Sequence, residues 1–509
     1  MWKLFESDGA EGKGVVAFIT NRKFLAGKPY AGLRKMMRER FDRIEIIDLR
    51  GDVRLGQRAG VEGDVGVFNI QVGTAITICI ADGSLEAARA TLPDGSLAPR
   101  ALAHVHYIDS WETGAFGRKA KLDLLAAATD AGRISGAVKV NRELLANMRP
   151  VPFQKGSWPG IESCFPFNRS GIQSKRDPFV YSVTAADLKN RLASFKVAAS
   201  TDAVVTGFHS TDAKPWSTAQ AQDIEDEKLV LAAYRPLDSR SFYNHLAFLD
   251  RPRPDLQAVW GKSNLCLYTM PSGIGEGPAV WCHGLLPDYH AFRGSYGGYA
   301  FPLYDRRPGS NPVNLSPALL AGLAMAYGQP VTPEDVFDAM LALLSATSYT
   351  LRFAEDLEDV FPHIPFPSAH SVFQRAAAIG REIRAVETFA RKPGDAFLTK
   401  SLAKEESDPT GVLADSIDWR DGTIILCANG SGRVSGIPEH IWQFAVSGYR
   451  LLPRWLGARA GQTVDRAFMK SMRDVAGRIA ELIDLFDRAD IVLTDALVET
   501  ITREKLGLD

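Results

Sequence analysis

The first part of the chain alternates between two spacings of apolar positions, which predict strands and helices in turn. Residues 14–20 (GVVAFIT) form a β-branched run that fits a buried strand. Residues 30–41 place apolar side chains on one face of a helix. Similar patterns predict strands at 44–48 and 74–80, an apolar patch at 101–108 and a charged helix at 118–129. Strands and helices with short links indicate an α/β layer, here about half of a doubly wound sheet.

The pattern changes twice further along the chain. Residues 150–168 are rich in proline and are typical of a domain boundary. Beyond them, residues 179–183 alternate like a strand and residues 185–195 like a helix, and helical patterns dominate from residue 311 onward. We therefore expect three domains: an α/β half-domain over 1–130, a mixed α+β domain over 131–310 and a mainly helical region over 311–509.

The composition is that of an ordinary globular protein and does not by itself indicate a nucleic-acid partner. Lys and Arg number 59 against 60 Asp and Glu, so any basic surface must be local. The five cysteines form no CxxC pair, which fits a reducing cytoplasm and argues against a structural zinc site. The sequence contains no leader pattern and no apolar run long enough for a membrane span. We expect a soluble, cytoplasmic protein with no membrane partner.

The sequence contains no complete catalytic constellation. The glycine cluster Gly273–Gly277 has no strand–helix frame, and no GxxxxGK[ST] motif occurs, so a nucleotide-binding loop is unsupported. His104 and His106 point to one strand face, but no third metal ligand has suitable spacing, and a pair of packed histidines fits better. No Gly-x-Ser-x-Gly elbow suggests a hydrolase. We assign no catalytic residue and no metal ligand.

Arginines and aromatic residues interleave in residues 234–254 (YRPLDSRSFYNHLAFLDRPRP). The arginines of this stretch are Arg235, Arg240, Arg251 and Arg253, and Asp238 and Asp250 lie beside them. A guanidinium group can hold phosphate or guanine through two hydrogen bonds, so this composition suits nucleic-acid contact. The alternative is that the arginines buttress loops through ion pairs and that the aromatic residues fill a core.

Segments spread along the chain occur in a characteristic order. They are 14–52, 66–80, 171–181 (GIQSKRDPFVY), 234–244 (YRPLDSRSFYN), 250–254 (DRPRP), 299–304 (YAFPLY), 349–367 and 441–459. In this order they resemble the methyltransferase and target-recognition portions of type ISP restriction–modification enzymes. Residues 14–52 look like the part of an adenine-specific DNA methyltransferase that follows its catalytic motif, and residues 66–80 look like the later strands of that domain. The match spans nearly the whole chain.

Two motifs of such methyltransferases are missing from the sequence. One is the Asn/Asp/Ser-Pro-Pro-Tyr/Phe tetrapeptide that positions adenine, and the other is the early glycine-containing strand–loop that holds S-adenosylmethionine. The resemblance therefore implies the C-terminal half of a Rossmann-like methyltransferase domain followed by a target-recognition, or specificity, domain. It implies S-adenosylmethionine as the cofactor of the complete enzyme, with none bound by this chain alone.

The function that the resemblance implies is DNA target recognition in a restriction–modification adenine-N6 DNA methyltransferase. The expected partners are double-stranded DNA and a separate polypeptide that carries the N-terminal methyltransferase half, and the chain alone is expected to be inactive. The alternatives are a truncated non-catalytic remnant, a regulatory DNA-binding protein and an unrelated protein-interaction module.

The places of individual residues in the matching segments indicate where contacts with DNA would occur. The cations expected to contact DNA are Arg235, Arg240, Arg251, Arg253, Lys175 and Arg176. Phosphate contacts position such a domain, and contacts to base edges specify the sequence. For each cation, an ion pair within the domain to Asp177, Asp238 or Asp250 is the alternative. Asn21 and Phe68 are expected to border the target-base pocket, with an ordinary turn residue and a core aromatic as their alternatives.

Overall fold

A short segment late in the chain, Phe353–Asp359, joins Met1–Lys155 in one unit of the computed structural model. We call this the N-terminal unit; Gly156–Arg352 and Val360–Asp509 form the C-terminal unit. The structure describes residues 2–6, 12–53, 55, 61, 63–130, 142–144, 148, 158–208, 215–260, 264–293, 297–358, 360–393, 404–405, 411, 413–430 and 432–508. The domain boundaries expected at residues 130 and 310 remain predictions.

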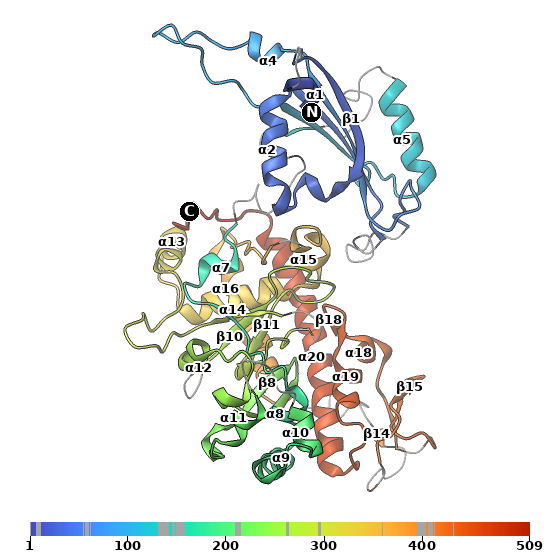
Figure 1. Ribbon diagram of the computed structural model, residues 1–509, viewed down its shortest axis with the longest axis vertical. Helices are drawn as coiled ribbons and strands as arrows, with labels where there is room; N and C mark the ends of the chain where they lie inside the picture. The colour runs from blue at the N-terminus through green and yellow to red at the C-terminus, as the bar shows by residue number, and fades with distance from the viewer. Residues whose placement is uncertain are drawn as a thin grey trace. The chain divides into compact units, whose positions relative to one another are not determined.

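A five-stranded sheet with the order β1-β3-β2-β4-β5 forms the centre of the N-terminal unit (Figure 1). Its strands are β1 (Gly14–Asn21), β2 (Arg43–Arg50), β3 (Thr74–Ala81), β4 (His104–Asp109) and β5 (Arg142–Leu144). β2 and β4 are parallel, and β3 lies antiparallel between β1 and β2. β1, β2 and β4 therefore run in one direction and end at the same edge of the sheet, which we call the carboxyl edge.

Helices cover parts of both faces of this sheet. α2 (Ala31–Arg40) packs Met37 into a core with Ile44, and α5 (Arg118–Asp130) packs Leu124 against Ile108 on the opposite face. The shorter helical elements of the unit are α1 (Trp2–Phe5), η1 (Arg22–Leu25), η2 (Lys28–Tyr30), α4 (Ser84–Ala87) and η5 (Asp356–Glu358). The α/β layer expected from the apolar pattern is confirmed.

The first strand differs from its expectation. The run of β-branched residues predicts a buried strand, but none of the eight residues of β1 is buried. Val15 and Ile19 are 63% and 54% exposed, and Ala17 between them is exposed as well. The reason is position, because β1 lies at the end of the strand order and no described strand pairs with its outer side.

The C-terminal unit contains three four-stranded sheets and one strand pair among its described residues. The strand orders are β11-β10-β13-β6, β12-β8-β9-β7, β14-β17-β16-β15 and β18-β19. The strands are β6 (Arg169–Ser170), β7 (Tyr181–Ser182), β8 (Leu229–Arg235), β9 (Asp238–Tyr243), β10 (Cys266–Thr269), β11 (Trp281–His283), β12 (Leu286–Pro287), β13 (Tyr299–Pro302), β14 (Lys404–Glu405), β15 (Asp418–Arg420), β16 (Thr423–Ile425), β17 (Arg433–Ser435), β18 (Ala445–Val446) and β19 (Tyr449–Arg450). Many short strands with long connections agree with the mixed α+β character expected for the middle of the chain.

Helices α14, α16 and α20 pack together as the helical core of this unit (Figure 1). The helices are α7 (Ile161–Cys164), α8 (Asp177–Val180), α9 (Ala185–Val197), α10 (Ala203–Phe208), α11 (Trp216–Gln220), α12 (Pro254–Trp260), α13 (Pro317–Tyr327), α14 (Pro333–Ser345), α15 (Thr347–Arg352), α16 (His370–Glu387), α18 (Glu439–Gln443), α19 (Leu451–Gly457) and α20 (Arg466–Ala496), with the 3-10 turns η3 (Asp226–Lys228) and η4 (Leu246–Phe248). Gly380 permits a close approach of α16 to α14, since a Cβ at this position would lie 1.7 Å from the Asp338 carbonyl oxygen.

Two details of the C-terminal unit differ from the sequence prediction. Residues 179–183 were expected to form a strand, but the helix α8 occupies Asp177–Val180 and the strand β7 is confined to Tyr181–Ser182. Pro178 in the first turn of α8 favours this helix, and the Phe179 and Val180 amides donate to the Arg176 carbonyl oxygen. The region from residue 311, which was expected to be mainly helical, contains strands β14 to β19 as well as helices α13 to α20.

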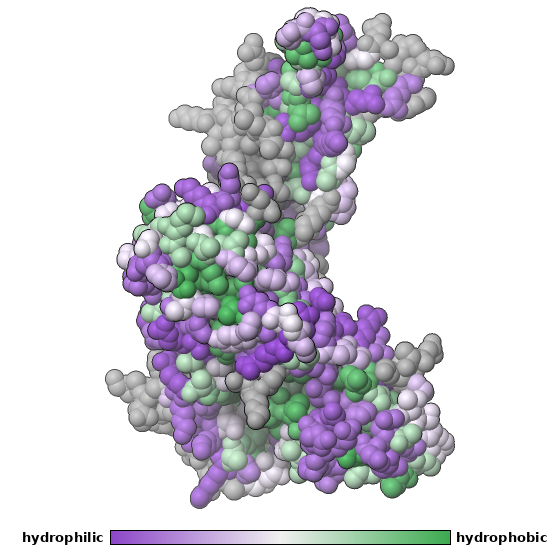
Figure 2. Space-filling model, turned by 90° about the vertical axis from the view of Figure 1, so that its left-hand side faces the viewer, coloured by the Kyte–Doolittle hydropathy of each residue, from purple (hydrophilic) through white to green (hydrophobic). Residues whose placement is uncertain are grey.

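The visible surface is chemically mixed. Figure 2 shows one face of the molecule, on which hydrophobic patches lie among hydrophilic residues. Such mixing is ordinary for a protein surface, so contact sites have to be located residue by residue. Within the described part of the chain, no helix combines the length and the apolarity needed to cross a membrane.

Candidate nucleic-acid interface

Two of the predicted DNA-contacting arginines lie on either side of one tyrosine ring in the β8–β9 hairpin. The guanidinium carbons of Arg235 and Arg240 are 3.9 and 3.8 Å from the centroid of the Tyr234 ring. The turn between the strands requires a left-handed backbone at Leu237, whose φ is 55°. Arg235 and Arg240 therefore stack on Tyr234 within the unit.

Arg235 forms an ion pair with Asp288 in the interior of the unit. Its side chain is 8% exposed, and its Nη1 donates to the buried Asp288 Oδ1 at 2.9 Å. The Tyr181 hydroxyl donates to Asp288 Oδ2 at 3.2 Å. Burial, assisted by the nearby Asp177 charge, raises the pKa of Asp288 to about 6 in spite of Arg235. Arg235 thus ties β8 to the segment after β12. It forms an ion pair within the unit, but with Asp288 and not with Asp177, Asp238 or Asp250, the partners that the sequence suggested.

Arg240 also belongs to a network inside the unit. Its Nε and Nη2 donate to Asp238 Oδ2 at 3.0 and 2.8 Å. The other carboxylate oxygen of Asp238 accepts a hydrogen bond from Arg459 Nη2 at 3.0 Å. Arg459 is buried, and its guanidinium lies 3.7 Å from the Trp455 ring centroid. Asp238 therefore links the hairpin to the end of α19.

The two cations of the preceding loop have opposite environments. Arg176 is fully buried, donates from Nη1 to the Phe248 carbonyl oxygen at 3.2 Å and lies over the Phe208 ring. Burial lowers the pKa of Arg176. Lys175 is 44% exposed, and its Nζ lies 3.2 Å from Asp250 Oδ2. Arg176 has no exposed surface and Arg235 is only 8% exposed, so neither guanidinium presents a surface for a phosphate, and we assign both to the interior scaffold.

Arg251 and Arg253 remain at the surface. The Arg251 side chain is 61% exposed, with its Nε 3.8 Å from Asp250 Oδ2. Arg253 is half-buried and donates from Nε to the Ser170 Oγ at 3.0 Å. Among the predicted DNA-contacting cations, Lys175, Arg251 and Arg253 have the more exposed side chains. Contact with DNA stays a prediction for each of them.

Arg253 lines a surface hollow that sequence reasoning missed. The hollow has a volume of about 670 Å³ and is lined by Asn168, Arg169, Ser170, Pro252, Arg253, Pro254, Asp255 and Tyr299. Arg169 is 51% exposed and forms an ion pair with Asp255. A second hollow of about 380 Å³ is lined by Tyr304, Asp305, Arg306, Arg307, Ser310 and Pro312. The sequence gives no sign that Arg169 and Arg253 lie in one hollow. Arg253 bonds to Ser170, the residue after Arg169, and 83 positions separate Arg253 from Ser170.

The two predicted pocket residues of the N-terminal unit lie in different settings. Asn21 ends β1 and caps η1, because its Oδ1 accepts a hydrogen bond from the Lys23 amide at 2.9 Å. This is the turn role named as its alternative. Phe68 is 40% exposed, as are Val65, Ile70 and Val72 to similar extents, so Phe68 is not a core aromatic. A contact of Asn21 or Phe68 with a flipped base stays a prediction.

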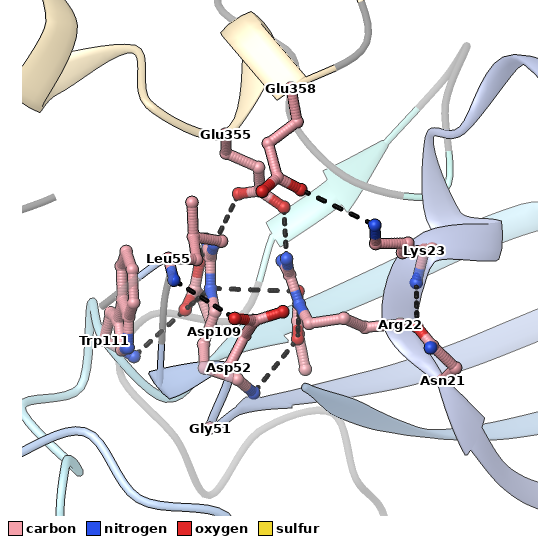
Figure 3. Close-up of polar contacts among 12 residues, drawn as sticks. Asn21, Arg22, Lys23, Gly51, Asp52, Leu55, Asp109, Trp111, Glu355 and Glu358 are labelled. Atoms are coloured by element: carbon pink, nitrogen blue, oxygen red, sulfur yellow. Dashed lines mark hydrogen bonds and ion pairs between the residues drawn. The ribbon is translucent and has the colours of Figure 1, made fainter. Parts of the chain in front are cut away.

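Charged side chains fill the carboxyl edge of the sheet, and Figure 3 shows how they converge. Arg22 donates from Nε and Nη2 to Asp48 at 2.7 and 2.5 Å. Arg50 donates to Asp109, and Glu355 forms ion pairs with both arginines. Although burial alone would raise it, the pKa of Asp48 is lowered, because Arg22 and Arg50 lie next to this carboxylate. These residues, with Tyr107 donating to Asp48, form what we call the carboxyl-edge network.

The sequence of the C-terminal unit matches a described protein family. The model of the family described as the Type ISP C-terminal specificity domain matches residues 163–485, which are more than half of the chain. The chain belongs to this family. Membership confirms the resemblance to type ISP restriction–modification enzymes and supports DNA target recognition as the role of these residues. No curated protein matches the chain in sequence.

Two solved structures share the fold of the chain. The first is "ATP-dependent Type ISP restriction-modification enzyme LlaBIII bound to DNA", with a TM-score of 0.55 and 19% identity over 97% of this chain and 33% of that chain. The second is a nuclease-deletion mutant of the Type ISP restriction-modification enzyme LlaGI in complex with a DNA substrate mimic, with a TM-score of 0.52 and 18% identity over 95% of this chain and 39% of that chain. The chain thus spans between a third and two fifths of their length, and the likeness shows the fold alone.

Proposed function

We propose that the chain recognises the DNA target of a restriction–modification adenine-N6 methyltransferase. The match to the Type ISP specificity domain over residues 163–485 carries this proposal. Methylation of the adenine amine requires the base to be flipped out of the duplex, so a separate surface has to find the site. Solvent-accessible cations on the C-terminal unit, among them Lys175, Arg251 and Arg253, support this role, because phosphate contacts position such a domain.

The catalytic half of this enzyme comes from outside the chain in our proposal. The sequence lacks the adenine-positioning tetrapeptide. The carboxyl edge, where open α/β sheets hold their ligands, is filled by the carboxyl-edge network, whose side chains bond to one another. These residues do not fit S-adenosylmethionine as a ligand, so we assign the cofactor pocket and the transfer chemistry to the complementary half.

The exposed strand β1 supports a docking role for the N-terminal unit. Val15, Ala17 and Ile19 point to one face of the sheet, beside their register partners Ile80, Ile78 and Ile76 on β3. All six side chains are apolar, and none of them is fully buried. An open strand edge with an apolar face is an aggregation hazard unless another chain covers it. The complementary methyltransferase half, which would extend the sheet beyond β1, is the occupant that we propose.

Selection from a pool of random duplexes tests the recognition role directly. The purified chain should enrich one short sequence, and labelled methyl groups should reach an adenine in that sequence only when the complementary half is added. Failure to enrich any duplex would overturn the proposal. Enrichment without methylation under any complement would instead support the remnant or regulatory DNA-binding protein, and methylation by the chain alone would overturn the need for a second half.

A further inference from the structure

The two surface hollows of the C-terminal unit share one aromatic ring. The guanidinium carbons of Arg169 and Arg307 lie 5.2 and 3.9 Å from the Phe167 ring centroid. Arg169 lines one hollow and Arg307 the other, so Phe167 lies between them. The Phe167 ring is itself buried and supports both guanidinium groups from below. We call the surface formed by both hollows the Phe167 surface.

Each arginine of the larger hollow is fixed along one side. Arg169 donates from Nε to Asp255 and from Nη1 to the Asn168 carbonyl oxygen. Arg253 donates from Nε to the Ser170 Oγ and from Nη1 to the Pro252 carbonyl oxygen. Within the described residues, Nη2 of each group has no hydrogen bond. Both guanidinium groups are therefore held in place with one donor nitrogen still available.

The smaller hollow repeats this arrangement. Arg307 donates from Nε and Nη2 to the Asp305 carboxylate, and its Nη1 has no partner among the described residues. The hydrogen bond from Arg307 lowers the pKa of Asp305, so this carboxylate is charged and holds the guanidinium at neutral pH. Among the described residues, four arginines and two aspartates line the two hollows, which gives these residues an excess of two positive charges.

We infer that the Phe167 surface binds the phosphate groups of duplex DNA through Arg169, Arg253 and Arg307. Arg169 and Arg307 lie back against the protein, held by Asp255, Asp305 and the ring, and Arg253 is held by Ser170 and the Pro252 carbonyl oxygen. In these positions the three arginines do not extend into a groove that is about 8.5 Å deep. Phosphates lie on the outside of the duplex and can reach them. Fixed guanidinium groups suit this contact because little side-chain freedom is lost on binding.

This inference rests on the proposed function and adds the residues that meet the DNA backbone. Substitutions Arg169→Gln, Arg253→Gln and Arg307→Gln remove one charge each. Each lost phosphate contact should reduce the slope of log affinity against log salt by about 0.9. Affinity should fall by the same factor for the recognised duplex and for a scrambled duplex. The matching Lys variants keep the charge and should keep the slope.

Arg375→Gln is the matched control. Arg375 is 49% exposed and paired with Asp495 on α20, as Arg169 is 51% exposed and paired with Asp255. Its removal should leave the salt slope unchanged. If the three variants keep their melting temperature and the wild-type slope while the chain still binds DNA, the inference is wrong and the proposed function stands. A selective loss for the recognised duplex would assign these arginines to base reading and would also overturn it. If the wild-type chain binds no duplex at all, the proposed function itself fails.

Discussion

Arg50 and Glu355 form an ion pair although 305 positions separate them in the chain. Both belong to the N-terminal unit, which the chain enters a second time at Phe353–Asp359. Glu355 pairs with Arg22 as well (Figure 3). Trp111 lies against the Arg50 guanidinium, whose carbon is 4.4 Å from the ring centroid. The N-terminal unit is therefore incomplete without a segment that is encoded in the middle of the specificity region. Separating the chain into two pieces near residue 155 would remove this segment from its network.

Glu355→Gln should destabilise the N-terminal unit. The variant removes a 17% exposed carboxylate from two buried arginines, and breaking such a pair costs about 3 kcal/mol or more. Glu358→Gln is the control within the same segment, because Glu358 lies 3.9 Å from the exposed Lys23 and such a surface pair contributes about 1 kcal/mol at most. Chemical denaturation of both variants provides the comparison. Equal effects would show that Glu355 is not the main anchor of the segment.

The stability of the C-terminal unit should depend on pH through Asp288. Its pKa is about 6 in the folded chain, against the ordinary value of 3.8. The folded state therefore binds more protons than the unfolded state between these values, so the contribution of Asp288 to stability falls as pH rises from about 4 to about 6. In Asp288→Asn this slope should disappear. Asp305→Asn is the opposite control, because the pKa of Asp305 is lowered, so its contribution to stability grows as pH rises toward the ordinary value of 3.8 and is complete above it. Denaturation series that extend from below pH 3.8 to above pH 6 distinguish the two signs.

The exposed face of β1 should be needed for methylation and not for DNA binding. Ile19→Lys places a charge on the apolar face, which should abolish association with the complementary methyltransferase half and the methylation that depends on it. Val197→Lys, at an 86% exposed position on α9, serves as the control and should change neither property. Copurification and labelled methyl transfer measure the two effects. Full association of the Ile19 variant would rule out β1 as the docking site.

Among the arginines of residues 234–254, Arg251 is best placed to contact a base edge. It is 61% exposed, and its Nε lies 3.8 Å from the nearest carboxylate oxygen of Asp250. Arg251→Ala should weaken binding of the recognised duplex by about 1–3 kcal/mol and should relax the sequence preference at one position. Fluorescence anisotropy with matched and singly substituted duplexes measures both changes. Unchanged affinity together with a lower melting temperature would mark Arg251 as scaffold instead.

Local patterns predicted several strands and helices of the N-terminal unit and missed the contacts between distant residues in the C-terminal unit. The runs at 44–48 and 74–80 became strands because β-branched residues favour extended backbone wherever they are covered. The burial of β1 was predicted wrongly, since the covering element is not determined by the strand itself. The partner of Arg235 lies 53 positions away, beyond any spacing rule, so the sequence could not distinguish an interior ion pair from a DNA contact. Arg169 was not predicted as a contact residue, because the hollow that it lines forms only when β6 pairs with β13.

Duplex binding by the purified chain at increasing salt tests the central claim most directly. Titrations would use the sequence enriched by selection and a scrambled duplex of equal length. The account predicts tighter binding to the enriched duplex, with log affinity falling linearly and steeply as log salt rises for both duplexes. Equal affinity for both duplexes, or binding that does not respond to salt, would contradict recognition of a DNA target by this chain.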